Sequence, residues 1–257
     1  MSGEKTLMRE SDLHYIYDGT LDGFYCCVYE SVYARAMPAV IEPEHEAQPS
    51  LMLETFVVTD AERAAKVRGS VPKKISRRSL ELVETVFLSC LEFKEMKMLR
   101  YLLLGYKEGP IIDRMLGHAD VAPLLAAERH LHGESHLLRG FIRFTDYDGV
   151  LAAVISPKNF VLPSLARHFA GRYNAQQFMI YDKTHKYALL HTGGRTEILR
   201  MEQVEFPAPS PEEKEYRELW KQFYKTIAIE ARENPKCRMT LMPKRYWENM
   251  TEMAPLL

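Results

Sequence analysis

Two short turn sequences constrain the fold of this chain more than any other feature. Asp148-Gly149 lies between two apolar-rich segments, and Gly193-Gly194 does the same further along the sequence. Such pairs form the two-residue turns of β-hairpins, because those turns need positive φ angles. These turns therefore predict a largely antiparallel sheet over residues from about 139 to 200. One helix, over about residues 162–173, interrupts it.

The segment before this sheet is predicted to begin with a small β-α-β-α section. Its strands are expected at residues 14–17 and 55–58, with a loop at residues 38–49 between them. Thr20 is expected to cap the first helix and Asp60 the second, since hydroxyl and carboxylate side chains accept hydrogen bonds from the free amides at a helix start.

Further helices are predicted in the middle and at the end of the chain. Residues from about 76 to 135 show helical apolar spacing, and residues 243–252 predict a last helix. Ser210 and Glu213 form a capping box before an amphipathic helix. The apolar stripe of that helix is Tyr216, Leu219, Trp220, Phe223, Tyr224 and Ile227. We expect the stripe to pack against the body of the protein, the alternative being a face that binds a partner.

These patterns place the chain in the α+β class. The predicted order is a small N-terminal β-α-β-α section, a helical middle, a largely antiparallel sheet with one interrupting helix, and C-terminal helices. Two parts are expected: an α+β domain over residues 1–206, and a C-terminal helical extension, residues 207–257, packed on the same body.

Composition narrows the compartment and the cofactors. No apolar run reaches the roughly 18 residues of a membrane span, and Met1 to Glu10 lacks the apolar stretch of a secretory signal, so we expect a cytoplasmic protein without membrane contact. The four cysteines lack zinc-finger or iron–sulfur spacing, and the CxxxCxxC of radical SAM enzymes is absent. No glycine-rich phosphate loop occurs. We therefore expect no cofactor.

The distribution of charge is more informative than its sum. The formal net charge of −1 gives no argument for nucleic-acid binding. Residues 66–78, however, contain six basic residues and no acidic one. Lys73, Lys74 and Arg77 of this stretch are candidate phosphate contacts, the alternative being neutralisation by the acidic residues that precede them.

Arg139, Phe141 and Arg143 alternate as they would on one face of a strand. An aromatic ring between two guanidinium groups suits single-stranded nucleic acid, because bases stack on the ring while the cations contact phosphates. The alternative is a strand with Phe141 in the core and its arginines at the sheet edge.

The helix expected at residues 162–173 carries a second group of cations. His168 and Arg172 lie one turn apart, and Arg167 is their neighbour. Positive charges at a helix C-terminus are favoured by the helix dipole and favour a bound phosphate or carboxylate. The alternative is ordinary capping, with Arg172 paired to Asp182 or a glutamate.

Four residues are candidates for acid–base chemistry. Asp182 or Glu134 is the candidate base, and His168 or His136 the candidate acid or electrostatic stabiliser. The histidines at positions 118, 130, 132 and 136 are close in sequence, but no agreed ligand spacing accompanies them, so no metal site is predicted.

Several of these motifs also carry a resemblance. The resembling stretches are YDGTLDGFYCCVYES (17–31), TDAERAAKVRGSVPKKIS (59–76), Glu134-x-His136 leading into GFIRF (140–144), ISPKNFVLPSLARHFAGRY (155–173), FMIYDKTHKYAL (178–189) and PKRYWENMTE (243–252). The chain is similar to a bacterial family of unknown function that is assigned to DNA metabolism. Its members are typically encoded beside a radical SAM protein connected with DNA modification or repair, and similar domains are fused to a uracil-DNA glycosylase-like domain.

The resemblance implies an accessory role in DNA repair or modification and brings no established catalytic activity. We therefore expect a DNA-binding accessory protein that acts with a radical SAM partner, on DNA that is single-stranded or damaged. One alternative is a base-excising hydrolase that uses an Asp/His or Glu/His pair. The other is a pure adaptor that docks the radical SAM partner through its C-terminal aromatic helices.

Overall fold

The computed structural model describes residues 9–227 and 234–253. The chain is an α+β protein, as predicted, and divides into two compact units, residues 1–130 and 131–257. The division falls within one helix, α5 (Ala122–Phe141), which contributes residues to both units. The boundary predicted at residues 206/207 lies elsewhere, because a helix shared by two cores leaves no linker composition to mark a division within it.

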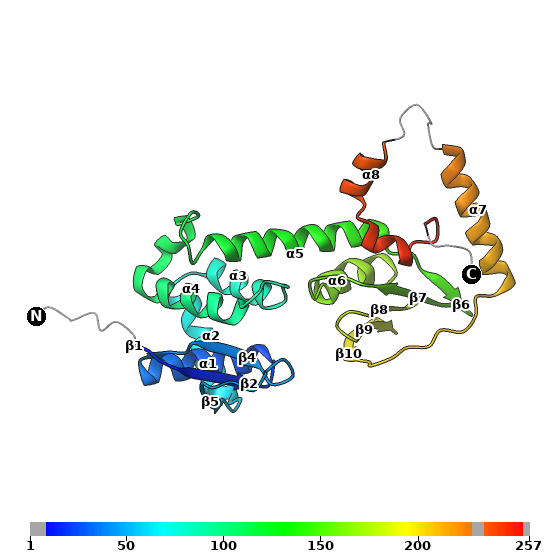
Figure 1. The fold of residues 1–257 in the computed structure, drawn as a ribbon. Helices are drawn as coiled ribbons and strands as arrows, with labels where there is room; N and C mark the ends of the chain where they lie inside the picture. Colours follow the sequence, from blue (N-terminus) through cyan, green and yellow to red (C-terminus); the bar gives the residue numbers. More distant parts are fainter. Residues whose placement is uncertain (1–8, 228–233, 254–257) are drawn as a thin grey trace, which may run out of the picture. The chain divides into compact units, whose positions relative to one another are not determined.

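The first unit begins with parallel strands. A three-stranded sheet has the order β4 (Val40–Pro43), β2 (Leu13–Tyr17), β5 (Leu53–Phe56), and β1 (Arg9–Glu10) pairs separately with β3 (Ala36–Met37) (Figure 1). β4 lies inside the segment expected to be a loop, where Pro43 and several acidic residues obscured a strand at the sheet edge.

Helices complete this unit. They are α1 (Leu21–Ala34), α2 (Ala61–Lys74), α3 (Arg77–Phe87), α4 (Lys94–Glu108), the 3₁₀ helix η1 (Gly109–Arg114) and the start of α5. Thr20 and Asp60 cap α1 and α2 as predicted, by accepting hydrogen bonds from the amides of Gly23 and Arg63. Buried side chains of α1, α2 and α4 form the first core, with Phe24, Val71 and Leu102 fully enclosed.

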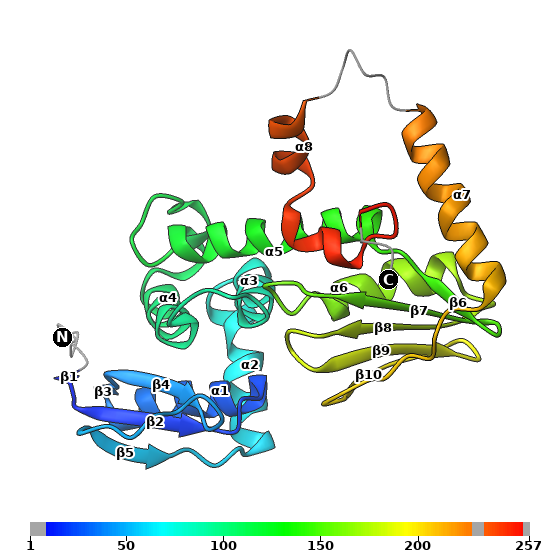
Figure 2. The ribbon, with the colours of Figure 1, turned by 45° about the vertical axis from the view of Figure 1, so that its right-hand side comes forward.

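The second unit contains a five-stranded sheet of order β10-β9-β8-β7-β6 (Figure 2). The strands are β6 (Thr145–Tyr147), β7 (Val150–Ile155), β8 (Gln177–Asp182), β9 (Tyr187–Thr192) and β10 (Arg195–Arg200). Both predicted hairpins are present, with positive φ at Asp148, Gly149, Gly193 and Gly194. Among the described strands of this sheet, only β7 and β8 pair in parallel, joined by α6 (Leu162–Arg172), so the prediction of a largely antiparallel sheet with one interrupting helix is confirmed.

Aromatic side chains fill the second core. Phe144 packs edge-on against Phe169, Tyr173 and Phe178. The 3₁₀ helix η3 (Lys244–Asn249) closes this core, because Tyr246 and the following Met250 are each 2% exposed within it. The helix predicted at residues 243–252 therefore exists in shorter form and belongs to the body of the second unit.

The amphipathic helix is α7 (Pro211–Ile227), and Ser210 caps it by accepting a hydrogen bond from the Glu213 amide. Three residues of its stripe do not pack as expected, since Tyr216, Leu219 and Phe223 are 70%, 54% and 52% exposed. Trp220 is the most enclosed of these four and lies under the Arg143 guanidinium, 5.6 Å from the ring centroid. The side chains of Tyr224 and Ile227 lie outside those that the structure describes. A short helix, α8 (Pro235–Leu241), was not predicted. Among the helices of the described residues, none has the length and apolar character needed to cross a membrane.

Candidate functional site

Arg139 and Phe141 do not lie on a strand, and that prediction was wrong. They belong to the last turn of α5, and β6 starts only at Thr145. The turn is held in the second core by Leu138, which is 2% exposed, and by Phe141, whose ring packs 5.9 Å from that of Tyr246. Phe141 is therefore a packing residue, and no aromatic face is presented between two arginines.

Arg143 is also bound by other residues of the second unit. Its Nη2 and Nε donate hydrogen bonds to the two carboxylate oxygens of Glu252, at 2.7 and 3.2 Å, and Nη1 donates to the Gly140 carbonyl oxygen at 2.7 Å. The Glu252 side chain is only 2% exposed. A bidentate pair with a buried carboxylate leaves Arg143 little capacity to contact a phosphate.

Two arginines and a histidine of α5 and α6 are brought together, and we call Arg139, His168 and Arg172 the α5–α6 cation cluster. Ser164 anchors it: its hydroxyl oxygen accepts a hydrogen bond from Arg139 Nη2 at 3.3 Å and lies 2.8 Å from the Ser135 hydroxyl. Ser164, His168 and Arg172 follow at i, i+4 and i+8, which places them along one face of α6.

The pKa of His168 reflects the proximity of Arg139 and Arg172. Its pKa is lowered, first because burial disfavours the charged imidazolium and then because Arg139 and Arg172 repel an added positive charge. No salt bridge within residues 9–227 and 234–253 joins Arg139, Arg167 or Arg172 to a carboxylate. Arg172 lies 5.8 Å from the ring of Tyr173, and Arg167 is exposed beside the cluster. The alternative to a bound phosphate, a pair between Arg172 and Asp182 or a glutamate, is not found among the described residues.

Glu134 is not placed to act as a base. Its side chain is 1% exposed and accepts hydrogen bonds from the amides of Lys158 and Asn159, the Asn159 side chain, Arg245 and Tyr246. Burial alone would raise its pKa, but these donors outweigh burial and lower it. A saturated carboxylate of this kind is a structural anchor. His136, two residues along α5, is exposed, so the Glu134/His136 pair is not assembled.

Within the described part of the chain, Asp182 contacts His185 and neither His168 nor His136, the two candidate acids. It is fully buried at the end of β8, and its Oδ2 lies 2.7 Å from Nδ1 of His185. Its Oδ1 accepts hydrogen bonds from the amides of Thr184 and His185, so Asp182 also shapes the turn. Among the described side chains, no hydrogen bond joins Asp182 to His168.

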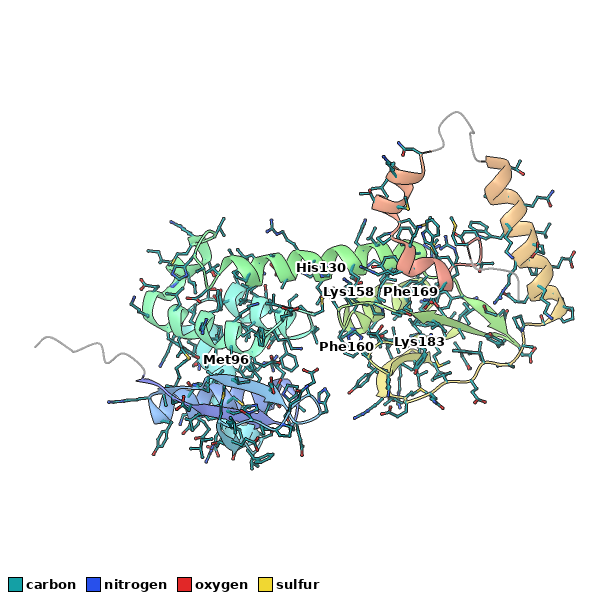
Figure 3. The ribbon with its side chains drawn as sticks, viewed as in Figure 1. Met96, His130, Lys158, Phe160, Phe169 and Lys183 are labelled. Carbon is teal, nitrogen blue, oxygen red and sulfur yellow. The ribbon has the colours of Figure 1, made fainter. Side chains whose placement is uncertain are left out.

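The His185 turn lies at the carboxyl ends of two parallel strands. Ile155 and Asp182, the last residues of β7 and β8, are register partners, so the loops that follow them leave the same sheet edge. Lys158 and Phe160 come from the first loop and Lys183 from the second, and all three are labelled in Figure 3. The ring of Phe160 packs edge-on against the His185 imidazole at 5.5 Å.

The remaining candidates lie in the first unit. Arg77 pairs with Glu81 one turn along α3, and Lys74 lies 5.9 Å from the ring of Tyr106. Lys73 is exposed at the end of α2. Of the four histidines near α5, His118 pairs with Asp120. Across the part of the chain that the structure describes, no three His, Cys, Asp or Glu side chains gather as metal ligands would.

Ser164, Arg245 and Tyr246 organise these sites and are not among the residues predicted from the sequence. Ser164 could have been found from its helical spacing to His168 and Arg172. Arg245 and Tyr246, which bind Glu134 from more than a hundred residues away, carry no local signal.

The fold and the site together define an α+β protein with a cation cluster on two helices of its second unit and no assembled metal centre among the described residues. The family model of a domain of unknown function, DUF4130, matches residues 92–252. This match covers more than half of the chain, and the chain belongs to that family. No curated protein matches the chain.

Proposed function

We propose that this chain is an accessory DNA-binding protein in DNA repair or modification, and that it contacts the phosphate backbone through the α5–α6 cation cluster with Arg167 beside it. The observation that supports the proposal is the approach of Arg139 and Arg172 to His168 without a carboxylate partner among the described residues. Arg139 and Arg172 both oppose protonation of His168, and a phosphate bound beside them offsets these two charges. The resemblance to a family assigned to DNA metabolism favours DNA as the source of that phosphate.

Backbone contacts of this kind make binding independent of sequence and strongly dependent on salt. Each neutralised phosphate releases condensed counterions, so the logarithm of affinity falls linearly with the logarithm of salt concentration, by about 0.7 per contact for a single strand. Three or four contacts give a slope of about −2 to −3.

The test is fluorescence anisotropy with labelled single-stranded and duplex oligonucleotides over a salt series. Arg139→Ala with Arg172→Ala should weaken binding at low salt at least tenfold and reduce the salt slope by about 1.5. Arg200→Ala is the matched control, because Arg200 is exposed in the same unit and paired with Glu202. Undetectable binding at low salt, or equal binding by the double variant and the control, would overturn the proposal.

The same proposal assigns the exposed stripe of α7 to the radical SAM partner. Tyr216, Leu219 and Phe223 present aromatic and aliphatic groups to solvent, and exposed apolar faces of helices commonly bind partners. Leu219→Gln with Phe223→Gln should abolish co-purification with the partner while DNA binding stays unchanged. Retained co-purification would remove this role for α7.

A second candidate is hydrolysis of a nucleic-acid substrate, favoured by the contact between buried Asp182 and His185. A buried carboxylate that holds one imidazole nitrogen orients the other as a general base. Cleavage or base release from damaged DNA should then be lost in His185→Ala and be retained in His136→Ala. Activity that survives His185→Ala, or no activity on any damaged substrate, would exclude this candidate.

A further inference from the structure

The first unit contains a pocket of about 600 Å³ that the DNA-binding proposal does not use. Its walls come from three helices, α1, α2 and α4, whose positions within that unit are visible in Figure 1. Its lining includes three cationic residues, Arg35, Lys66 and Lys74, and three tyrosines, Tyr29, Tyr33 and Tyr106, but no acidic residue. A volume of this size accommodates a small organic ligand.

One wall is aromatic. Tyr29 and Tyr33 follow at i and i+4 on α1, with ring centroids 6.1 Å apart and planes within 7° of parallel. Tyr33 is 78% exposed, so its other face is free for a planar group to stack upon. Tyr106 of α4 supplies a third ring, and its hydroxyl lies 2.6 Å from that of Ser70.

The facing wall carries positive charge. Lys66, Ser70 and Lys74 follow at i, i+4 and i+8 on α2, which places them along one side of the helix. Lys66 Nζ lies 5.8 Å from the Tyr29 ring, and Lys74 Nζ lies 5.9 Å from the Tyr106 ring. Each ammonium group is therefore held beside an aromatic face.

These lysines are not neutralised in the way their neighbours are. Arg63, one turn before Lys66, pairs with Glu30 at 2.5 Å, and Arg68 pairs with Glu84 at 2.8 Å. Among the described residues, no salt bridge joins Lys66, Lys74 or Arg35 to a carboxylate. α2 therefore pairs the arginines outside the pocket and leaves the lysines that line it for an external anion.

We propose that this pocket binds a nucleotide, with the base stacked on Tyr33 and the phosphate held by Lys66 and Lys74. Stacking of a base on an aromatic side chain contributes about 1–3 kcal/mol, and the buried Val28 and Val67 provide an apolar floor. An inorganic anion would leave the tyrosines unused, and an uncharged aromatic ligand would leave the lysines unused. A nucleotide satisfies both walls, whether it is free or part of a single strand.

The inference does not depend on the α5–α6 cation cluster, because all the lining residues belong to the first unit. The variants can separate the two sites. Tyr33→Ala and Lys66→Ala with Lys74→Ala alter the pocket, whereas Arg139→Ala with Arg172→Ala alters the cluster. Lys107→Ala is a control for the loss of one lysine charge outside the pocket, because Lys107 is exposed and paired with Glu108 in the first unit.

The experiment is calorimetric titration of the full chain, at low salt, with thymidine 5′-monophosphate, thymidine, inorganic phosphate and a short oligothymidylate. The monophosphate or the oligonucleotide should bind, and Tyr33→Ala and the double lysine variant should each weaken binding at least tenfold. Tyr33→Phe should restore it, because the ring is retained. Thymidine and inorganic phosphate should each bind the wild-type chain at least tenfold more weakly than the nucleotide probe that binds. Thermal unfolding of every variant verifies that the pocket is folded.

The outcomes distinguish the sources and the sites. Binding of the monophosphate identifies a free nucleotide as a ligand, and binding of the oligonucleotide alone identifies a single strand. The oligonucleotide can also bind the α5–α6 cation cluster. Its binding to the pocket is therefore measured in the Arg139→Ala, Arg172→Ala variant, as the affinity that is lost when Tyr33→Ala is added. Equal binding of inorganic phosphate and monophosphate, no loss in Tyr33→Ala, or no binding of either nucleotide probe would overturn the proposal.

Discussion

Glu134 of α5 and Arg245 of η3 are joined by a hydrogen bond of 2.8 Å, although 111 residues separate them in the sequence. The carboxylate is 1% exposed and also receives the amides of Lys158 and Asn159. One buried charge therefore connects α5, the loop after β7 and the C-terminal η3. This arrangement explains why η3 belongs to the second unit and why Glu134 has no free lone pair for catalysis.

Replacement of Glu134 should destabilise the second unit without affecting a reaction directly. Glu134→Ala removes the acceptor of several buried donors and leaves the Arg245 charge unpaired, which should cost about 3 kcal/mol of unfolding free energy. Urea denaturation monitored by tryptophan fluorescence measures this. His136→Ala, at an exposed position on the same helix, should change stability by less than about 0.5 kcal/mol. Equal effects of the two variants would contradict the role of Glu134.

The effect of Glu134 should depend on pH. Its folded pKa is lowered, so the carboxylate stabilises the fold fully above the ordinary value of 4.5, and this contribution is lost as the pH falls through the lowered pKa. The stability difference between the wild type and Glu134→Gln should therefore narrow in acid. A difference that stays constant from neutral pH down to about pH 3 would show that the charge of Glu134 is not the cause.

Arg143 should matter for stability and not for DNA binding. Arg143→Ala leaves the buried Glu252 carboxylate without its bidentate partner, which should cost about 3 kcal/mol. Arg143→Ala with Glu252→Gln should recover part of that loss, because no unpaired charge remains. The affinity for oligonucleotides of the folded single variant should equal that of the wild type. A tenfold loss of affinity in a fully folded Arg143→Ala would return Arg143 to the interface.

Features that depend on neighbouring residues could be predicted from the sequence. The caps at Thr20 and Asp60 and the turns at Asp148 and Gly193 each follow from side-chain chemistry within a few positions. The α+β class followed from the same local patterns.

The strand predicted through Arg139 and Arg143 does not form, because the alternating pattern of its residues also fits the end of a helix. Leu138 and Phe141 are three residues apart and face the second core together, so tertiary packing extends α5 across them. Similarly, Arg143 could be recognised as a cation but not as the partner of Glu252, 109 residues away. The sequence therefore indicated which residues are cationic, and folding determined which of them are neutralised.

Gly149 provides a test of the hairpin turn. Its φ is +88°, and Asp148 before it has φ +52°, both in the region that L side chains adopt at a cost. Gly149→Ala should destabilise the β6–β7 hairpin by about 1–2 kcal/mol, although an added Cβ would meet no atom within 4 Å. Asp148→Asn should be tolerated, since Asn also adopts this conformation. Thermal unfolding of both variants measures the difference, and an unchanged Gly149→Ala would show that the turn relaxes.

His168 should make DNA binding depend on pH. In the free protein its pKa lies below the ordinary value of 6.5, because burial and the charges of Arg139 and Arg172 disfavour the imidazolium. A phosphate bound at the cluster offsets that repulsion and raises the pKa, so binding takes up a proton between the two values. Affinity should therefore rise as the pH falls from about 8 to about 6, by about tenfold for each unit of difference in pKa.

The variants of His168 separate this linkage from general effects of acid. His168→Gln should remove the pH dependence while its affinity at about pH 8 stays close to that of the wild type, because the wild-type imidazole is neutral there. His136→Ala should keep the full dependence. In the absence of DNA, His168 affects folding stability in the opposite direction. Its folded pKa lies below the unfolded value, so the unfolded chain binds more protons and the free energy of unfolding falls as the pH falls below about 6.5. Parallel pH profiles for wild type and His168→Gln, in binding and in unfolding, would place His168 outside the phosphate contact and away from the two arginines.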